Sequence, residues 1–303
     1  YFEALNHEIY NKLWEEVKAH FNSQGLLKNE KFSADYNFLE VPAVGWNDIV
    51  IDTINRDLLE RNITNFIPHI AVYQDNNLNA SRGILISGPP GTGKTLCCNV
   101  IMNQVGVTTI YVCRNAIKNE GQISRLYKMA RHLSPSLVII EDIDTLGGID
   151  RREIADHPLL GEFLNCLSGV EKNDGVITLA TTNYPQHLDW ALSDRPGRFD
   201  TRIEFGYPKD KTRKKILSKY LDPFSHKVDL SSVVKKTEGF SGAYLRETVQ
   251  NAFMLAFERS GFDSEKSKIL QSDVDTALST MIQQKSKVSL EKGIKDVTEE
   301  IYG

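Results

Sequence analysis

The 303-residue sequence predicts an α/β fold in which a parallel sheet, covered by helices on both faces, is followed by a small helical domain. Two observations support this prediction. Between residues 44 and 207 short apolar runs alternate with helical patterns, and after Pro208 only helical patterns remain. The expected strands are the runs GILISG at 83–88, TTIYVC at 108–113, LVII at 137–140, VITLATT at 176–182 and RIEF at 202–205.

The sequence divides into four parts. Residues 1–43 contain an amphipathic helix over about 1–22, with apolar residues spaced by three and four, and then a polar linker. Residues 44–207 form the large α/β domain. Residues 208–284 form the helical domain, with helices expected around 211–220, 241–257 and 272–282. The tail at 285–303 is polar and weakly helical, and we assign it no function.

The composition is that of a globular protein, with 41% apolar and 25% charged residues. A formal net charge of -4 gives no overall attraction to nucleic acid or to anionic membranes, so nucleic acid is not the expected partner. The basic run KDKTRKK at 209–215 is interpreted as a solvated helix face. No apolar stretch approaches the roughly 20 residues of a membrane-spanning helix.

The four cysteines show no metal-ligand spacing and indicate a reducing compartment, cytoplasmic or another intracellular one. Two of them are adjacent, and the other two lie in apolar runs where a cysteine packs as a small hydrophobic residue. They are Cys97, Cys98, Cys113 and Cys166.

The segment GPPGTGKT, 88–95, predicts a phosphate-binding loop. It follows an expected strand and precedes the helical pattern LCCNVIMNQV, which is the context that this chemistry requires. Glycines let the backbone N–H groups point at phosphate oxygens, Lys94 reaches the β and γ phosphates, and Thr95 offers its hydroxyl to magnesium. A glycine-rich turn without function is the alternative, but the four fixed letters arise by chance in on the order of one such chain in a hundred. The expected nucleotide-binding residues are Gly88, Pro89, Pro90, Gly91, Thr92, Gly93, Lys94, Thr95 and Leu96.

The run LVIIEDID, 137–144, ends abruptly on acids. Taken alone, it is more typical of a strand that ends in solvated carboxylates. A phosphate loop, however, requires a second strand that ends in acid to hold magnesium and to position water. Glu141 and Asp142 are therefore the candidates, one for the metal and one for the attacking water. The expected ligands are ATP and Mg²⁺.

Together with the loop, two further segments resemble the AAA ATPases, and the resemblance extends over about 44–282. ATTNYPQHLDWALSDRPGRFD, 180–200, resembles the family's second region of homology, and EGFSGAYLRE, 238–247, resembles its lid segment. The resemblance makes Asn183 a sensor that helps orient water, and makes Arg195 and Arg198 fingers that act on the neighbouring subunit's nucleotide. It thereby implies a homo-oligomeric ring, usually of six chains.

The resemblance also places two segments beside the adenine. Asp48 and Ile49, in GWNDIV, match one of them, and Gly242 and Ala243 of the lid match the other. Ordinary turn and core packing is the alternative for these four positions, as a solvated loop is for the R-P-G-R sequence. Arg246 projects from the same lid helix, and we assign it no role.

The sequence departs from the family pattern in the order of its acidic pair. The pair reads Glu141 then Asp142, as in a branch that includes the mitochondrial translocase of the folded Rieske protein. If roles follow position, Glu141 faces the metal and Asp142 acts on water. Asp144 is expected to support the site or to cap a helix.

The piece that corresponds to the family's pore loop also departs from the pattern. Residues 113–127 offer Asn115, Ala116 and Ile117 and no aromatic residue before the helix. Threading by aromatic side chains is therefore not indicated, and a wide pore for a folded client fits as well. The leading hypothesis is a ring-forming ATPase that remodels, unfolds or translocates a protein client. The alternatives are a nucleic-acid loader or initiator and a small-molecule kinase, the latter leaving R-P-G-R and the helical domain unexplained.

Overall fold

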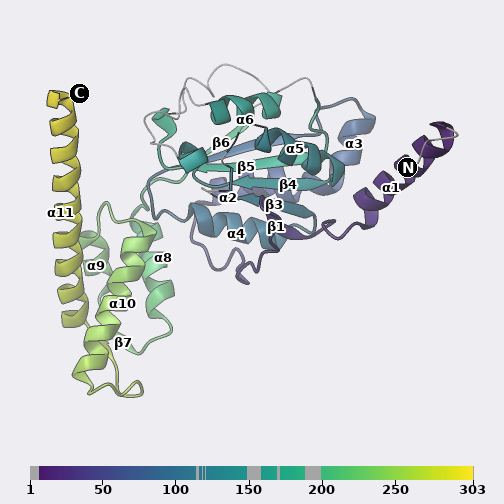
Figure 1. The fold of residues 1–303 in the computed structure, drawn as a ribbon. Helices are drawn as coiled ribbons and strands as arrows, with labels where there is room; N and C mark the ends of the chain where they lie inside the picture. Colours follow the sequence, from purple (N-terminus) through teal and green to yellow (C-terminus); the bar gives the residue numbers. More distant parts are fainter. Residues whose placement is uncertain are drawn as a thin grey trace. The chain divides into compact units, whose positions relative to one another are not determined.

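A computed structural model describes residues 7–302 except 114, 115, 118, 120, 149–157, 169, 170 and 188–198 (Figure 1). The chain divides into two compact units. The first, the sheet unit, comprises Tyr1–Gly88 and Lys94–Phe205, and the second, the helical unit, comprises Pro89–Gly93 and Gly206–Gly303. Each unit is described by itself.

The sheet unit is built on a six-stranded sheet whose paired strands are all parallel, in the order β1-β3-β4-β5-β2-β6. This confirms the α/β prediction, and every strand that the sequence predicts is present within a residue of its expected start. The strands are β1 (Lys31–Ser33), β2 (Arg82–Ser87), β3 (Thr108–Val112), β4 (Ser136–Ile140), β5 (Val176–Thr182) and β6 (Thr201–Glu204).

Strand β1 lies in the segment that the sequence predicts to be a polar linker, so that prediction is wrong for Lys31–Ser33. The strand has three residues, which is too short for a periodic pattern, and it forms through its pairing with β3. Its central side chain, Phe32, is 0% exposed. Residue 34 extends the pairing, because the backbone N–H of Ala34 donates to the carbonyl of Tyr111 at 2.9 Å.

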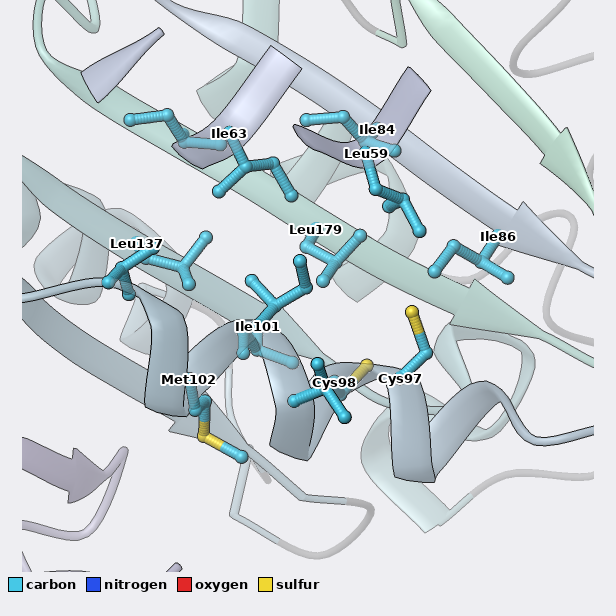
Figure 2. Packing of buried hydrophobic residues seen from close by; sticks show 14 of the residues in the cluster. Leu59, Ile63, Ile84, Ile86, Cys97, Cys98, Ile101, Met102, Leu137 and Leu179 are labelled. Carbon is cyan, nitrogen blue, oxygen red and sulfur yellow. The ribbon is translucent and has the colours of Figure 1, made fainter. Parts of the chain in front are cut away.

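Helices cover both faces of the sheet. Apolar side chains of α5 (Gln122–His132) and α6 (Pro158–Ser168) pack on the face that carries Val138. The opposite face, which carries Leu137 and Ile139, packs on α4 (Lys94–Gln104) and on the segment before β2 (Figure 2). In Figure 2, Cys97 and Ile101 of α4 face Leu179 of β5.

The segment between 52 and 76 consists of short helical pieces. They are α2 (Thr53–Leu59), the π-helical turn Glu60–Thr64, the 3₁₀ turn Ile67–His69 and α3 (Ile70–Asp75). Two further 3₁₀ turns, Ile143–Gly148 and Pro185–His187, follow β4 and β5. Leu59 and Ile63 are fully buried against the sheet, as Figure 2 shows.

The helix predicted at the start of the chain is α1 (His7–Gln24). Its Leu13, Trp14, Val17 and Phe21 are between 42% and 57% exposed. Within the described part of the chain, no helix combines the length and the apolar character needed to cross a bilayer.

The helical unit contains the three helices that the sequence predicts. They are α8 (Asp210–Leu221), α10 (Gly242–Arg259) and α11 (Gln271–Tyr302). The sequence missed a short helix, α9 (Leu230–Lys236), and a two-residue parallel pair, β7 (His226–Lys227) with β8 (Ile269–Leu270). Helix α11 continues through most of the segment that the sequence described as a weakly helical tail.

Two expectations about surface position are each wrong at one residue. Cys113, which the sequence predicts to pack as a small hydrophobic residue, is exposed because it follows the last residue of β3 rather than lying within the strand, whereas Cys97 and Cys98 are buried. In the basic run at 209–215, Arg213 is only 5% exposed. Its guanidinium donates to the carbonyls of Pro208 and Val234, so it closes a contact inside the unit instead of facing solvent.

The missed strand β1 yields a stability prediction. Phe32→Ala should lower the free energy of unfolding by about 3 kcal/mol, because a fully buried ring leaves a cavity. Phe38→Ala is the matched control, since Phe38 is 61% exposed and should cost less than about 1 kcal/mol. Urea unfolding of the two variants measures both values. Equal losses would show that β1 is not packed as described.

Candidate functional site

The sheet order brings together the carboxyl ends of three strands that are distant in sequence. Strand β5 lies between β4 and β2, and all three run in the same direction. The residues that directly follow these strands are Gly88 after β2, Glu141 after β4 and Asn183 after β5. They are three of the residues that the sequence predicts for the site, and the carboxyl edge of such a sheet is where α/β proteins bind ligands.

The first two glycines of the loop are required by their surroundings. Gly88 has a φ of +150°, and a Cβ placed on it would lie 2.2 Å from the carbonyl oxygen of Phe205. Gly91 has a φ of +76°, and a Cβ there would lie 2.8 Å from the Ser241 hydroxyl and 2.9 Å from the Cβ of Ala243. Any other side chain would therefore displace the loop.

Two residues predicted to lie beside the adenine, Gly242 and Ala243, pack against this loop inside the helical unit. They form the first turn of α10, whose N-cap is Ser241. The backbone N–H of Ala243 donates to the carbonyl of Gly91 at 3.0 Å. The hydroxyl of Thr92 donates to the carbonyl of Pro89 at 2.8 Å, which closes the turn from within.

Lys94 carries a buried ammonium group, although its side chain is that of a typical surface residue. The residue is 6% exposed, and Nζ donates to the carbonyl of Gly88 and to Oδ1 of Asn183, each at 2.7 Å. Burial lowers the pKa of Lys94, and the negative charges of Asp142 and Asp144 oppose that change. The desolvated ammonium is thus held at the mouth of the loop by acceptors from β2 and β5.

Asp142 turns toward β5. Its Oδ1 accepts a hydrogen bond from Nδ2 of Asn183 at 2.7 Å, and its backbone N–H donates to the hydroxyl of Thr181 at 3.0 Å. Its φ of +47° lies in the left-handed region, which costs energy for a residue with a side chain. This conformation, at the residue after Glu141, lets two consecutive acids take different partners.

Asp144 fixes the other side of Asn183. It is 0% exposed, and its Oδ1 accepts from the hydroxyl of Thr182 at 2.8 Å and from the backbone N–H of Asn183 at 3.2 Å. The sequence predicts a supporting role for Asp144, and these contacts are of that kind. The two threonines were missed, although polar residues at the end of the apolar run VITLATT are a signal that could have found them.

Glu141 turns toward β3. Its Oε2 accepts a hydrogen bond from the hydroxyl of Tyr111 at 2.7 Å, a contact that sequence reasoning missed. Burial raises the pKa of Glu141, and the hydroxyls of Tyr111 and Thr95 partly offset that rise. The other oxygen, Oε1, is buried and has no donor at hydrogen-bonding distance and angle among the described residues, although the Thr95 hydroxyl and the Cys98 thiol lie near the carboxylate.

These atoms fit a magnesium ion that accompanies a triphosphate. A buried carboxylate oxygen that lacks a donor, close to the exposed Thr95 hydroxyl, is a site where an oxygen-preferring cation replaces the missing partner. Among the described residues, no group of three or more His, Cys, Asp or Glu side chains could hold an ion alone. Magnesium is commonly held by one or two protein oxygens together with phosphates and water, so the small ligand set is consistent with it.

Comparison with known proteins agrees with this geometry. Residues 84–207 match the family model "ATPase family associated with various cellular activities (AAA)", and residues 227–272 match the AAA+ lid domain. The chain belongs to the AAA ATPase family.

Three relatives of this AAA chain illustrate the range of similar proteins. ATP-dependent zinc metalloprotease FtsH 3 of Symbiobacterium thermophilum is 32% identical over 271 residues, 82% of this chain and 41% of that protein. The cell division cycle protein 48 homolog of Archaeoglobus fulgidus is 31% identical, over 80% of this chain and 35% of its own length. ATPase family gene 2 protein of Schizosaccharomyces pombe is 30% identical, over 79% of this chain and 30% of its own length. This chain therefore spans between 30% and 41% of the length of these relatives.

Several other residues predicted for the site make contacts that are typical of turns or of the hydrophobic core. Oδ2 of Asp48 accepts from the backbone N–H of Gly45 at 2.9 Å, which closes a turn, and Ile49 packs into the core cluster beneath the sheet. Leu96 packs against the same cluster. In the expected pore-loop piece, Ile117 is 3% exposed and belongs to the core rather than to a displayed loop. Arg195, Arg198 and Asn115 lie outside the described residues.

The buried carboxylate of Glu141 yields a pH prediction for the protein without nucleotide. A carboxyl group whose pKa is raised by folding contributes stability below its ordinary value of 4.5 and loses it as the pH rises through the folded-state pKa. Glu141→Gln cannot ionise, so in EDTA it should be more stable than the unmodified chain at pH 8, and the difference should shrink toward pH 4.5.

Urea unfolding between pH 5 and pH 8 measures this difference. Glu204→Gln, at an exposed position at the end of β6, controls for the change in net charge. A stability gain that is the same at every pH would contradict the assigned cause.

Proposed function

We propose that this chain is a Mg-ATP hydrolase that assembles into a homo-oligomeric ring, of six copies by family resemblance, and remodels, unfolds or translocates a protein client. One observation carries most of the proposal: Lys94, Asp142 and Glu141 converge at the carboxyl edge of the sheet, where Asn183 contacts both Lys94 and Asp142 while Tyr111 contacts Glu141. A reducing compartment such as the cytoplasm suits this chain, because its cysteines are free thiols.

Nucleotide binding is assigned to the loop and to Lys94. Backbone N–H groups at the start of α4 and in the loop before it favour a phosphate, and the dipole of the 11-residue helix adds to the attraction. Lys94 exchanges its contacts with Gly88 and Asn183 for phosphate oxygens. Because the ammonium is already desolvated, little reorganisation of water opposes that exchange.

Glu141 and Thr95 are assigned to the metal. A bound Mg²⁺ would neutralise negative charge on the oxygens of the β and γ phosphates. Thr95 is exposed and contributes its hydroxyl, and Glu141 contributes the oxygen that lacks a donor. The phosphates and water would supply the remaining ligands of a bound ion.

Asp142 is assigned to the attacking water. Its carboxylate accepts the proton as the water oxygen bonds to the γ phosphorus, and the bond to the β-phosphate oxygen breaks so that ADP leaves. Asn183 contacts both Asp142 and Lys94, so it couples the position of the base to that of the phosphate-binding ammonium. This assignment follows the order of the two acids in the sequence. It makes Asp142, which has the shorter side chain, the residue that acts on the attacking water.

Arg195 and Arg198 are assigned to the neighbouring copy's nucleotide. A guanidinium group is always charged and presents a planar fork of donors that matches the oxygens of a transferring phosphoryl group. The assignment rests on the family pattern of 180–200. It makes hydrolysis depend on assembly, because each site is completed by a second chain.

Asp142→Asn should bind ATP within a few-fold of the unmodified affinity and hydrolyse it about 10²- to 10⁴-fold more slowly, since only the proton acceptor is lost. Fluorescent-nucleotide binding and phosphate release measure the two quantities. Lys94→Ala is the contrasting variant and should lose detectable ATP binding. Steady turnover by Asp142→Asn would refute the role given to Asp142.

Arg195→Ala should lower hydrolysis by about 10³-fold or more while sparing nucleotide affinity, because the arginine contacts the phosphates of another chain only in the transition state. The decisive measurement mixes Arg195→Ala with Asp142→Asn chains, each inactive alone. Phosphate release should recover, since the second variant supplies Arg195 to sites that retain Asp142. No recovery on mixing, with rings present in both samples, would show that the arginine does not act between chains.

A further inference from the structure

Tyr111 stands next to the carboxylate pair and has no part in the assignments above. Its hydroxyl donates to Oε2 of Glu141 at 2.7 Å, and the two residues lie on neighbouring parallel strands. An ionised carboxylate can only accept hydrogen bonds, so the phenol O–H is the donor in this contact. The contact is therefore directional.

The strand that carries Tyr111 is held on both sides. Tyr111 is in register with Ser33 of β1 and with Ile139 of β4, and its carbonyl accepts from the backbone N–H of Ala34 at 2.9 Å. Its ring is half-buried against the core cluster that also contains Ile139. Backbone pairing and ring packing thus fix the position of the hydroxyl before any ligand binds.

The Tyr111 contact accounts for which oxygen of Glu141 is available. Oε2 is engaged by Tyr111, whereas Oε1 is buried without a donor among the described residues and the carboxylate lies close to Thr95. With one oxygen held, the carboxylate cannot rotate freely, and the other oxygen keeps a fixed direction. Asp142 is held by Asn183 and Thr181 of the opposite neighbouring strand.

We propose that Tyr111 is a positioning residue for the metal: it holds Glu141 so that Oε1 faces the magnesium ion bound with ATP. The inference rests on the proposed Mg-ATP function and deepens it. It also explains how a chain with the order Glu then Asp separates the two roles, because the first acid is tied to β3 and the second to β5. Removing a residue that orients a metal ligand through a hydrogen bond typically weakens metal affinity by about 10- to 100-fold.

The test is a titration of Mg²⁺ into the protein saturated with a non-hydrolysable ATP analogue. Binding of Mg²⁺ is monitored by calorimetry or by the fluorescence of a labelled nucleotide analogue. Tyr111→Phe, which removes one hydroxyl and keeps the ring, should raise the Mg²⁺ concentration at half-saturation by about 10-fold. Affinity for the nucleotide measured in EDTA should not change. A Mg²⁺ midpoint equal to that of the unmodified protein would overturn the proposal.

Tyr127→Phe is the matched control. Tyr127 is fully buried in the same unit, and its hydroxyl makes a hydrogen bond with Thr178 at 2.9 Å rather than with either acid of the pair. It should lose stability and leave the Mg²⁺ midpoint unchanged. An equal shift in both variants would mean that Tyr111 acts through general destabilisation, which overturns the positioning role.

A double-variant cycle keeps the test independent of folding effects. If Tyr111 acts through Glu141, the variant that combines Tyr111→Phe with Glu141→Gln should have the Mg²⁺ midpoint of Glu141→Gln alone. Additive shifts would overturn the proposal. If the unmodified protein does not bind the nucleotide, or binds it equally well with and without Mg²⁺, the proposed function fails instead, and the two failures are thereby distinguished.

Discussion

The arrangement of the whole site depends on the position of β4 between β3 and β5 in a parallel sheet. Parallel strands end at the same edge, so each residue after β4 has a polar neighbour available on either side. Two consecutive acids can then take opposite partners, Glu141 toward Tyr111 and Asp142 toward Asn183. The left-handed backbone at Asp142 makes this divergence possible, and the hydrogen bonds on both sides offset its cost.

Charge balance at the site is the second constraint. A buried ammonium is costly unless acceptors replace its lost water, and Lys94 has the Gly88 carbonyl and the Asn183 amide oxygen for that purpose. The acids around it add favourable charge, as the effect of Asp142 and Asp144 on its pKa indicates. A site assembled in this way is preorganised for a phosphate, because the bound ligand replaces existing acceptors rather than water.

Within the helical unit, the backbone of the loop at Gly91 and the first turn of α10 constrain each other's position. The carbonyl of Gly91 receives the N–H of Ala243, and the absence of a side chain at Gly91 allows Ser241 to cap the helix close by. A change in the loop backbone would therefore alter a hydrogen bond of the helix.

The sequence by itself determined the class of fold, because strand-and-helix alternation is a local pattern whose physical causes lie within a few residues. For the same reason the motif GPPGTGKT predicted a phosphate-binding loop. The sequence also predicted roles for Glu141 and Asp142, although not their directions. Only the tertiary structure decided that β1 exists and that Tyr111 meets Glu141, since three-residue strands carry no periodicity and strand order is absent from local sequence. The site follows from which strands are neighbours, and that is a property of the assembled sheet.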